Sequence, residues 1–361
     1  MRSDASNISS HGVPTSTRAI AVISGKGGTG KTMLLAAIAK ILDLSGSTVT
    51  VVDADTGTGG LTYYLGVDLV TNTAVGLSDL IAPANGHVPI SSKEMLQPIK
   101  GMDRALFLGV GDHRRLFREL EHEELPSKLG DIVRSLKSLG SSYVLVDCRG
   151  GIDPESLAIC SAVDEIILVA EADTTSFQAS QHVVDILNAH QLGTKLRGFI
   201  INKVIDDPSV VIRTGTSVFR CTNLGAVPFD LEATRAFLIG ELPPLRSPFL
   251  VHTWAAVQKL APGDVPEPPG RPWTRREFRE IGFANLESVR GGAVLAGVLF
   301  LICVLLPLSI TSADRVFGLR VYDMLVISGL TLGLLGCFEP FRRALGKIVL
   351  AYVDVLSRRL K

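Results

Sequence analysis

Short apolar runs alternate with helical stretches between residues 19 and 260. The runs are continuous in hydrophobic character, which is typical of strands buried on both faces of a sheet. They are AIAVIS, TVTVVDAD, SYVLVDCRGG, EIILVAEAD, LRGFIINKV and GAVPF. Segments with helical spacing lie between them, notably MLLAAIAKILDL and residues 174–190. This order predicts an α/β fold with a mostly parallel, doubly wound sheet, in which ligands bind at the carboxyl ends of the strands.

The pattern changes after about residue 260, where APGDVPEPPGRPW is rich in Pro and Gly and predicts a linker. Residues 291–310 then form an uncharged apolar run, which spans roughly 30 Å as a helix, the thickness of a bilayer core. A second apolar run covers 324–338. Together they predict a C-terminal transmembrane helical hairpin, with one span plus an interfacial helix, or a soluble chain with buried core helices, as the alternatives.

These patterns divide the chain into five parts. They are a disordered N-terminus over 1–17, an α/β domain over 18–258, a linker and basic juxtamembrane segment over 259–290, two transmembrane helices within 291–338, and an amphipathic basic tail over 339–361.

Charge is unevenly distributed along this neutral chain. Residues 271–361 hold 13 Lys and Arg against 7 Asp and Glu. The whole chain has 36 of each kind, so residues 1–270 hold 23 Lys and Arg against 29 Asp and Glu. The acidic larger part argues against nucleic acid as a partner, whereas the basic tail suits an anionic lipid bilayer. Basic residues concentrate outside the pair of apolar runs, which predicts that both flanks lie in the cytoplasm. We therefore expect a multi-pass protein of the bacterial inner membrane.

A glycine loop follows the first predicted strand and precedes a predicted helix. It matches G-x-x-x-x-G-K-[ST] with the residues Gly25, Lys26, Gly27, Gly28, Thr29, Gly30, Lys31 and Thr32. Glycines let backbone N–H groups converge on phosphate oxygens, and a helix N-terminus adds partial positive charge. Lys31 is expected to contact the β and γ phosphates, and the Thr32 hydroxyl to ligate Mg²⁺. The loop predicts a nucleoside triphosphate site.

Lys26 is a second lysine in this loop, and "KGGTGKT" resembles the deviant Walker motif of the MinD/ParA family. The resemblance extends over about residues 18–255 and implies ATP and Mg²⁺ as cofactors. It also implies an ATP-dependent homodimer, in which Lys26 reaches the nucleotide of the partner subunit and acts there as a catalytic residue beside Lys31. A charge that is supplied by a partner couples dimerisation to the nucleotide state.

The same resemblance assigns further site residues. Asp55, the second aspartate of "VVDAD", would orient the attacking water, and Asp53 would lie in the magnesium shell. Asp147 of "VLVDCRGG" would hold Mg²⁺ through water, with Gly150 or Gly151 facing the γ-phosphate. Asn202 of "INKV" and Pro228 of "VPFD" would lie at the adenine. The implied activity is ATP hydrolysis in a switch that recruits or releases a protein partner.

Two departures from the family pattern leave alternatives open. Met33 stands where a small hydroxyl residue is usual, and Arg149 where proline is frequent. Arg149 would either stabilise charge in the transition state or pair with an acid such as Asp153. A hydrolysis-poor nucleotide-binding membrane scaffold is the first alternative. A bacterial tyrosine kinase-like enzyme is the second; such enzymes carry their spans before the catalytic domain and a tyrosine-rich tail, whereas this tail holds only Tyr352.

Overall fold

The structure is a computed structural model, and the chain divides into two compact units, Met1–Phe278 and Arg279–Lys361. The described residues are 16–65, 75–82, 91–112, 124–274 and 277–278, together with the backbone of 315–316 and 319–320. In the second unit the described residues form one antiparallel pair, β9 (Arg315–Val316) and β10 (Leu319–Arg320). Within all these ranges no helix has both the length and the apolar character to cross a bilayer. The predicted spans, 291–310 and 324–338, and the tail lie outside the described residues.

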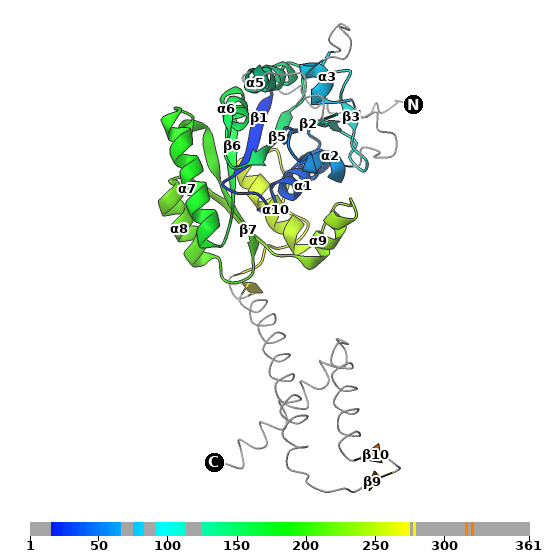
Figure 1. Cartoon of the computed structure of the whole chain (residues 1–361), viewed down its shortest axis with the longest axis vertical. Coiled ribbons are helices and arrows are strands. Elements are labelled where there is room, and N and C mark those ends of the chain that lie inside the picture. The colour runs from blue at the N-terminus through cyan, green and yellow to red at the C-terminus, as the bar shows by residue number, and fades with distance from the viewer. Residues whose placement is uncertain are drawn as a thin grey trace, which may run out of the picture. The chain divides into compact units, whose positions relative to one another are not determined.

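An eight-stranded sheet forms the centre of the first unit (Figure 1), with the order β3-β4-β2-β5-β1-β6-β7-β8. Its strands are β1 (Arg18–Ser24), β2 (Val49–Asp53), β3 (Gln97–Pro98), β4 (Ala105–Leu108), β5 (Tyr143–Gly150), β6 (Glu165–Glu171), β7 (Leu196–Val204) and β8 (Asn223–Pro228). All neighbours pair in parallel except β3 and β4. The prediction of an α/β fold with a mostly parallel sheet is confirmed.

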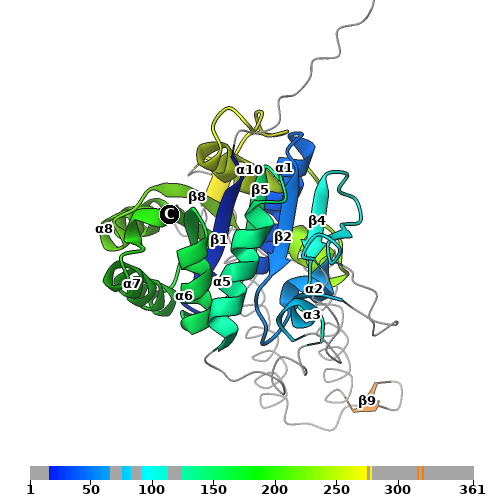
Figure 2. The ribbon, with the colours of Figure 1, turned by 90° about the horizontal axis from the view of Figure 1, so that it is seen from above.

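Helices cover both faces of this sheet (Figure 2), as expected for a doubly wound fold. They are α1 (Lys31–Leu44), α2 (Gly60–Tyr64), α3 (Leu77–Ile81), α5 (Glu124–Lys137), α6 (Pro154–Ala162), α7 (Thr174–Ala189), α8 (Ser209–Phe219), α9 (Leu231–Leu238) and α10 (Pro248–Leu260), with a 3-10 turn, η2 (Gly193–Lys195), before β7. Residues of α3 and α5–α8 share one buried apolar cluster, and residues of α1, α2, α9 and α10 share the other.

Strand β1 shows why the strand sequences are apolar throughout. Ile20 and Val22 belong to the cluster on the α1 face, whereas Ala21 and Ile23 belong to the cluster on the α5 face. Successive side chains of a strand point to opposite faces, so a strand that is covered on both sides needs an unbroken apolar run. Polar groups are therefore left to the strand ends, where the loops begin.

The Pro- and Gly-rich segment after α10 packs against the rest of the first unit, to which it belongs. The Trp254 indole N–H donates to the carbonyl of Pro266 (2.8 Å), and the Tyr143 hydroxyl donates to Asp264 (2.5 Å). Further along, the Trp273 backbone N–H donates to Nε2 of His252 (2.7 Å). Trp273 and Phe278 both stack edge-on against the His252 ring. His252 therefore joins α10 to the chain that follows it.

We expect His252 to make the domain sensitive to acid. Burial lowers its pKa to about 4, while its ring also hydrogen bonds with the Ala226 backbone. The folded state therefore binds fewer protons than the unfolded state between pH 4 and the ordinary histidine pKa near 6.5. The contribution is complete above about pH 6.5, and up to about 3 kcal/mol is lost as pH falls to 4.

The measurement is the urea unfolding free energy at pH 7 and pH 4.5, followed by fluorescence of Trp254 and Trp273, the two tryptophans of the chain. His252→Gln keeps an acceptor for the Trp273 N–H but carries no titrating group. It should flatten the profile relative to wild type. Equal loss of stability in both proteins would exclude His252 as the acid-sensitive group.

Candidate nucleotide-binding site

The glycine loop joins β1 to α1 and has the backbone that its sequence predicts. Gly28 and Gly30 have φ values of 82° and 83°, a left-handed region that favours glycine. Lys31 begins α1 and is buried, with 7% of its surface exposed. The Thr29 hydroxyl is buried and has no hydrogen-bond partner among the described residues. The loop therefore presents a helix N-terminus and a buried cation at the carboxyl edge of the sheet, an arrangement that binds phosphate.

Gly25 and Gly27 provide a matched steric test of this loop. A Cβ on Gly25 would lie 2.3 Å from backbone atoms of Ala179 and Ser180, whereas a Cβ on Gly27 would meet nothing within 4 Å. Gly25→Ala is therefore expected to cost about 3 kcal/mol of unfolding free energy, because the α7 backbone must move. Gly27→Ala should stay within about 0.5 kcal/mol of wild type. Denaturant unfolding measures the free energy of unfolding of both variants. Equal values for the two would contradict the close packing of Gly25 against α7.

Asp147, within β5, lies against the start of α1. Its Oδ2 accepts a hydrogen bond from the Thr32 hydroxyl (2.7 Å), while its Oδ1 is buried without a hydrogen-bond partner in the described part of the chain. Burial raises the pKa of Asp147 to about 6, against the opposing charge of Lys31. An unpartnered buried carboxylate oxygen beside a hydroxyl fits a divalent cation, so Thr32 and Asp147 are the residues that would hold Mg²⁺.

Few protein ligands are available for such a cation. Among the described residues, no group of three or more His, Cys, Asp or Glu is placed to hold a metal ion. Mg²⁺ in nucleotide sites typically takes one or two protein oxygens and completes its shell with phosphate oxygens and water. The donor set at Thr32 and Asp147 agrees with that chemistry.

Asp53 lies beside Asp147 because the two residues are register partners in β2 and β5. Its Oδ2 accepts from both the N–H and the hydroxyl of Thr62 (2.7 Å each), and its Oδ1 accepts from the Asp55 N–H. Burial, then the charge of Asp147, raises its pKa to about 7. Asp53 thus fixes the loop after β2, and its predicted place in the magnesium shell stays a prediction.

Asp55 follows β2 and is half-buried. Its Oδ1 accepts from the N–H groups of Gly57 and Thr58 (3.2 and 3.1 Å), and its Oδ2 accepts from the Thr58 hydroxyl (2.6 Å). The charge of Asp55 also contributes to the raised pKa of Asp147, and Asp55 comes two residues after Asp53, the register partner of Asp147. This loop holds Asp55 near the predicted metal position.

The loop after β5 touches the glycine loop directly. The Gly151 N–H donates to the Ser24 carbonyl (2.9 Å), and a Cβ on Gly150 would lie 2.8 Å from Gly27. The Arg149 side chain is 55% exposed and lies 3.9 Å from Asp153, and a Cβ on Gly57 would lie 3.2 Å from its guanidinium. The pairing with Asp153 is present in this structure, and a role of Arg149 in the transition state stays a prediction.

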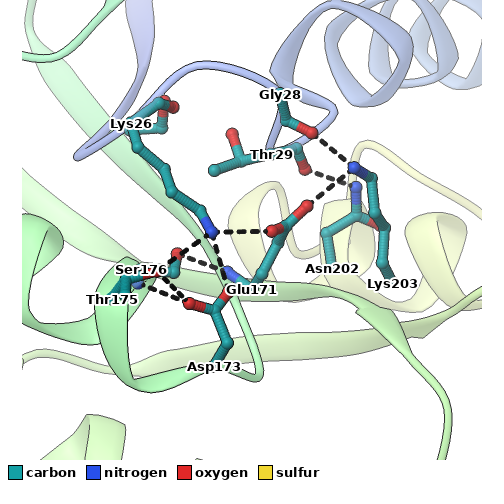
Figure 3. Close-up of polar contacts among 10 residues, drawn as sticks. Lys26, Gly28, Thr29, Glu171, Asp173, Thr175, Ser176, Asn202 and Lys203 are labelled. Carbon is teal, nitrogen blue, oxygen red and sulfur yellow. Dashed lines mark hydrogen bonds and ion pairs between the residues drawn. The ribbon is translucent and has the colours of Figure 1, made fainter.

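Lys26 is bound by acids of its own chain (Figure 3). Its Nζ lies 3.1 Å from Glu171, at the end of β6, and 2.8 Å from Asp173, the N-cap residue of α7. These contacts raise the pKa of Lys26, and Lys26 holds the pKa of Asp173 well below its usual range. The Lys26 side chain remains 32% exposed. In this single chain the second lysine is therefore paired in cis, on the accessible edge of the site.

Asn202 lies near the end of β7, and Pro228 ends the neighbouring strand β8. The Asn202 amide nitrogen donates to the Thr29 carbonyl (2.8 Å), and the residue is 2% exposed. Pro228 is buried and pairs with Val204. Asn202 is thus brought to the glycine loop, while contact of either residue with an adenine stays a prediction.

Three polar residues at this edge were not expected from the sequence. They are Glu171, Asp173 and Lys203, and all three lie within the contacts of Figure 3. In the sequence, Glu171 and Asp173 belong to "EAD" at the end of one apolar run, and Lys203 belongs to "NK" near the end of the next. Carboxylates at strand ends often cap the following helix, as Asp173 does for α7, so that pattern alone does not identify a site.

Comparisons with known proteins agree with this geometry. Residues 20–236 match the family described as the CobQ/CobB/MinD/ParA nucleotide binding domain. An uncharacterized ATP-binding protein of Methanocaldococcus jannaschii is 29% identical over 223 residues, which cover 62% of this chain and 78% of that protein. A putative septum site-determining protein MinD of Oltmannsiellopsis viridis is 27% identical, over 59% of this chain and 65% of that protein.

Among solved structures, the septum site-determining protein MinD complexed with Mg-ADP from Pyrococcus horikoshii OT3 superposes with a TM-score of 0.58. It is 23% identical and covers 68% of this chain and 96% of its own. The sheet order and the glycine loop define a P-loop nucleotide-binding protein of the MinD/ParA type. Since the family match extends over more than half of its residues, the chain belongs to the CobQ/CobB/MinD/ParA nucleotide-binding family.

Proposed function

We propose that this protein is a membrane-anchored ATPase that works as a nucleotide-dependent dimer switch. The observation that carries the proposal is the convergence of Lys31, Thr32, Asp147 and Asp55 on one edge of the sheet, with the second lysine, Lys26, on the accessible side. One lysine suffices for binding phosphate. A second, exposed and paired in cis, suits a residue that changes partner when a second subunit arrives.

Each residue has a defined task in hydrolysis of ATP to ADP and phosphate. Backbone N–H groups of the loop and Lys31 bind the phosphates. Thr32 and Asp147 would hold Mg²⁺, which when bound neutralises phosphate charge. Asp55 orients water for attack, and its carboxylate would accept a proton from that water. Lys26 exchanges Glu171 and Asp173 for the phosphate of the partner's nucleotide.

Membrane anchoring rests on the sequence beyond residue 290. The apolar runs at 291–310 and 324–338, with basic residues on their outer flanks, support a hairpin with the ATPase domain and the C-terminus in the cytoplasm. We place the protein in the bacterial inner membrane. Confinement there raises the effective concentration of the subunits for one another.

A protein partner that recognises the closed dimer completes the proposal. A structural relative is described as a MinC:MinD cell division protein complex from Aquifex aeolicus, with a TM-score of 0.55 and 22% identity. That likeness shows the fold alone, so the partner of this chain is defined only as a protein that binds the ATP-bound pair.

The test is ATP hydrolysis by the full chain in nanodiscs across a series of protein concentrations. Specific activity should rise with concentration and saturate, because two subunits make one active unit. Lys31→Ala should remove nucleotide binding altogether. Specific activity that is constant with concentration would contradict a dimer switch.

A scaffold that binds ATP and hardly hydrolyses it is the second candidate. Two observations favour it: both oxygens of Asp55 accept hydrogen bonds from its own loop, and Arg149 lies 3.9 Å from Asp153. Tight ATP binding without turnover at any concentration would select this function.

A further inference from the structure

Strand β7 contacts the glycine loop through two consecutive side chains. The Asn202 amide nitrogen donates to the Thr29 carbonyl (2.8 Å), and the Lys203 ammonium donates to the Gly28 carbonyl (Figure 3). The two carbonyls belong to successive residues of the loop. Side chains that follow each other in a regular strand point to opposite faces, so this arrangement needs a change in the backbone.

The backbone of β7 shows that change at Lys203. Its φ is 56°, a left-handed value that is uncommon outside glycine. The pairing of β7 with β8 also shifts register between Ile201 and Val204. Irregularities of this kind re-aim side chains and recur beside functional sites. Here the irregularity directs Lys203 to the outer side of the glycine loop.

Contacts with these two carbonyls determine where the neighbouring N–H groups point. A peptide unit is planar and trans, so its carbonyl and its N–H point in opposite directions. When Lys203 binds the Gly28 carbonyl on the outside, the Thr29 N–H points into the loop. When Asn202 binds the Thr29 carbonyl, the Gly30 N–H does the same. Inward N–H groups are the ones that bind phosphate.

Glu171 links this arrangement to the second lysine. Its Oε1 lies 2.7 Å from the Lys203 ammonium, and its Oε2 lies 3.1 Å from the Lys26 ammonium. Its side chain is 19% exposed, so both ion pairs are partly shielded from solvent. One carboxylate therefore binds the lysine that contacts the outside of the loop and the lysine that is proposed to leave for a second subunit.

We propose that Lys203, anchored by Glu171, is a positioning residue that orients the glycine loop for phosphate. Because Glu171 also binds Lys26, the affinity of the loop for nucleotide is linked to the release of Lys26. The first part requires only that the loop binds a nucleotide phosphate, and the second part rests on the proposed function.

The test compares Lys203→Met with Lys195→Met. Lys195 precedes the opposite end of β7 and likewise binds backbone carbonyls, those of Ser161 and Val163 (2.7 and 2.8 Å). Loss of a charged donor is expected to raise the dissociation constant of a fluorescent ATP analogue with Mg²⁺ about tenfold in Lys203→Met. Lys195→Met should stay within about twofold of wild type, although it loses a comparable contact. In steady-state kinetics the loss in Lys203→Met should appear as a raised KM for ATP, since the residue acts on binding.

Hydrogen exchange of the nucleotide-free protein gives a readout without any ligand. The Leu34 amide, which donates to the Gly30 carbonyl at the end of the loop (3.0 Å), should exchange about tenfold faster in Lys203→Met and at the wild-type rate in Lys195→Met. Unchanged affinity and exchange in Lys203→Met, or equal changes in both variants, would overturn the positioning role. Failure of the wild type to bind ATP would instead contradict the proposed function, and the exchange measurement would still decide the role of Lys203.

A double-mutant cycle tests the anchor. Glu171→Gln should weaken nucleotide binding severalfold in the wild type and hardly at all in Lys203→Met, because the two residues act through one contact. Glu165→Gln is the control, since Glu165 begins the same strand and pairs with Arg18 (2.7 Å) far from the loop. Independent, additive effects of Glu171→Gln and Lys203→Met would show that Glu171 does not act through Lys203.

Discussion

Lys26→Ala is expected to lower ATP turnover at least about 100-fold, while the affinity for a single nucleotide stays within about threefold of wild type. In the single chain Lys26 pairs with Glu171 and Asp173, and its link to Lys203 through Glu171 accounts for a change in affinity of up to about threefold. A cation supplied from a second subunit acts on the charge that develops in the transition state, so its loss should appear in kcat. Steady-state turnover and equilibrium binding of a fluorescent ATP analogue measure the two effects separately.

Lys40→Ala is the matched control for this prediction. Lys40 is a partly exposed lysine of α1 that pairs with Asp43 (3.4 Å). Its replacement removes one lysine and one ion pair from the same domain, and turnover should stay near wild type. If Lys26→Ala loses binding and turnover in equal proportion, Lys26 serves its own nucleotide and the trans role is wrong.

The central sheet could be predicted from the sequence because burial on both faces leaves continuous apolar runs. All six predicted strands are present, and the glycine loop lies between the first strand and the first helix, as expected. Strands β3 and β4 were missed for a physical reason. β3 has two residues, and β4 has four, of which Leu106 is 39% exposed, so neither forms a long apolar run.

The site could be predicted only where one short motif contains it. Gly25 to Thr32 are contiguous, whereas Lys26 and Asp173 are 147 residues apart, and the fold alone brings them together. Lys203 was missed because its side chain reaches the loop through a positive φ, which no periodicity indicates for a lysine. Asn202 was expected at the adenine; the structure adds its contact with the Thr29 carbonyl, which no resemblance had suggested.

Asp55→Asn is expected to lower turnover about 100- to 1,000-fold and to leave ATP binding intact. The amide oxygen can still accept from the Gly57 and Thr58 N–H groups, so the loop should keep its shape, but the group can no longer accept a proton. Asp131→Asn, at an exposed acid paired with Arg134, should have no effect. Retained turnover in Asp55→Asn would remove Asp55 from the reaction.

Mixing Asp55→Asn with Lys26→Ala then decides whether the lysine acts in trans. In a mixed dimer the subunit that lacks Lys26 still has Asp55, and it receives Lys26 from its partner. Random pairing makes half of the dimers mixed, each with one complete site, so two nearly inactive proteins should together regain about a quarter of wild-type turnover. If Lys26 acts in cis, no subunit in the mixture holds both residues, and the activity stays at the sum of the two variants. Recovery on mixing would therefore establish a paired active site, in which the acids that bind Lys26 in the single chain compete with the partner's nucleotide.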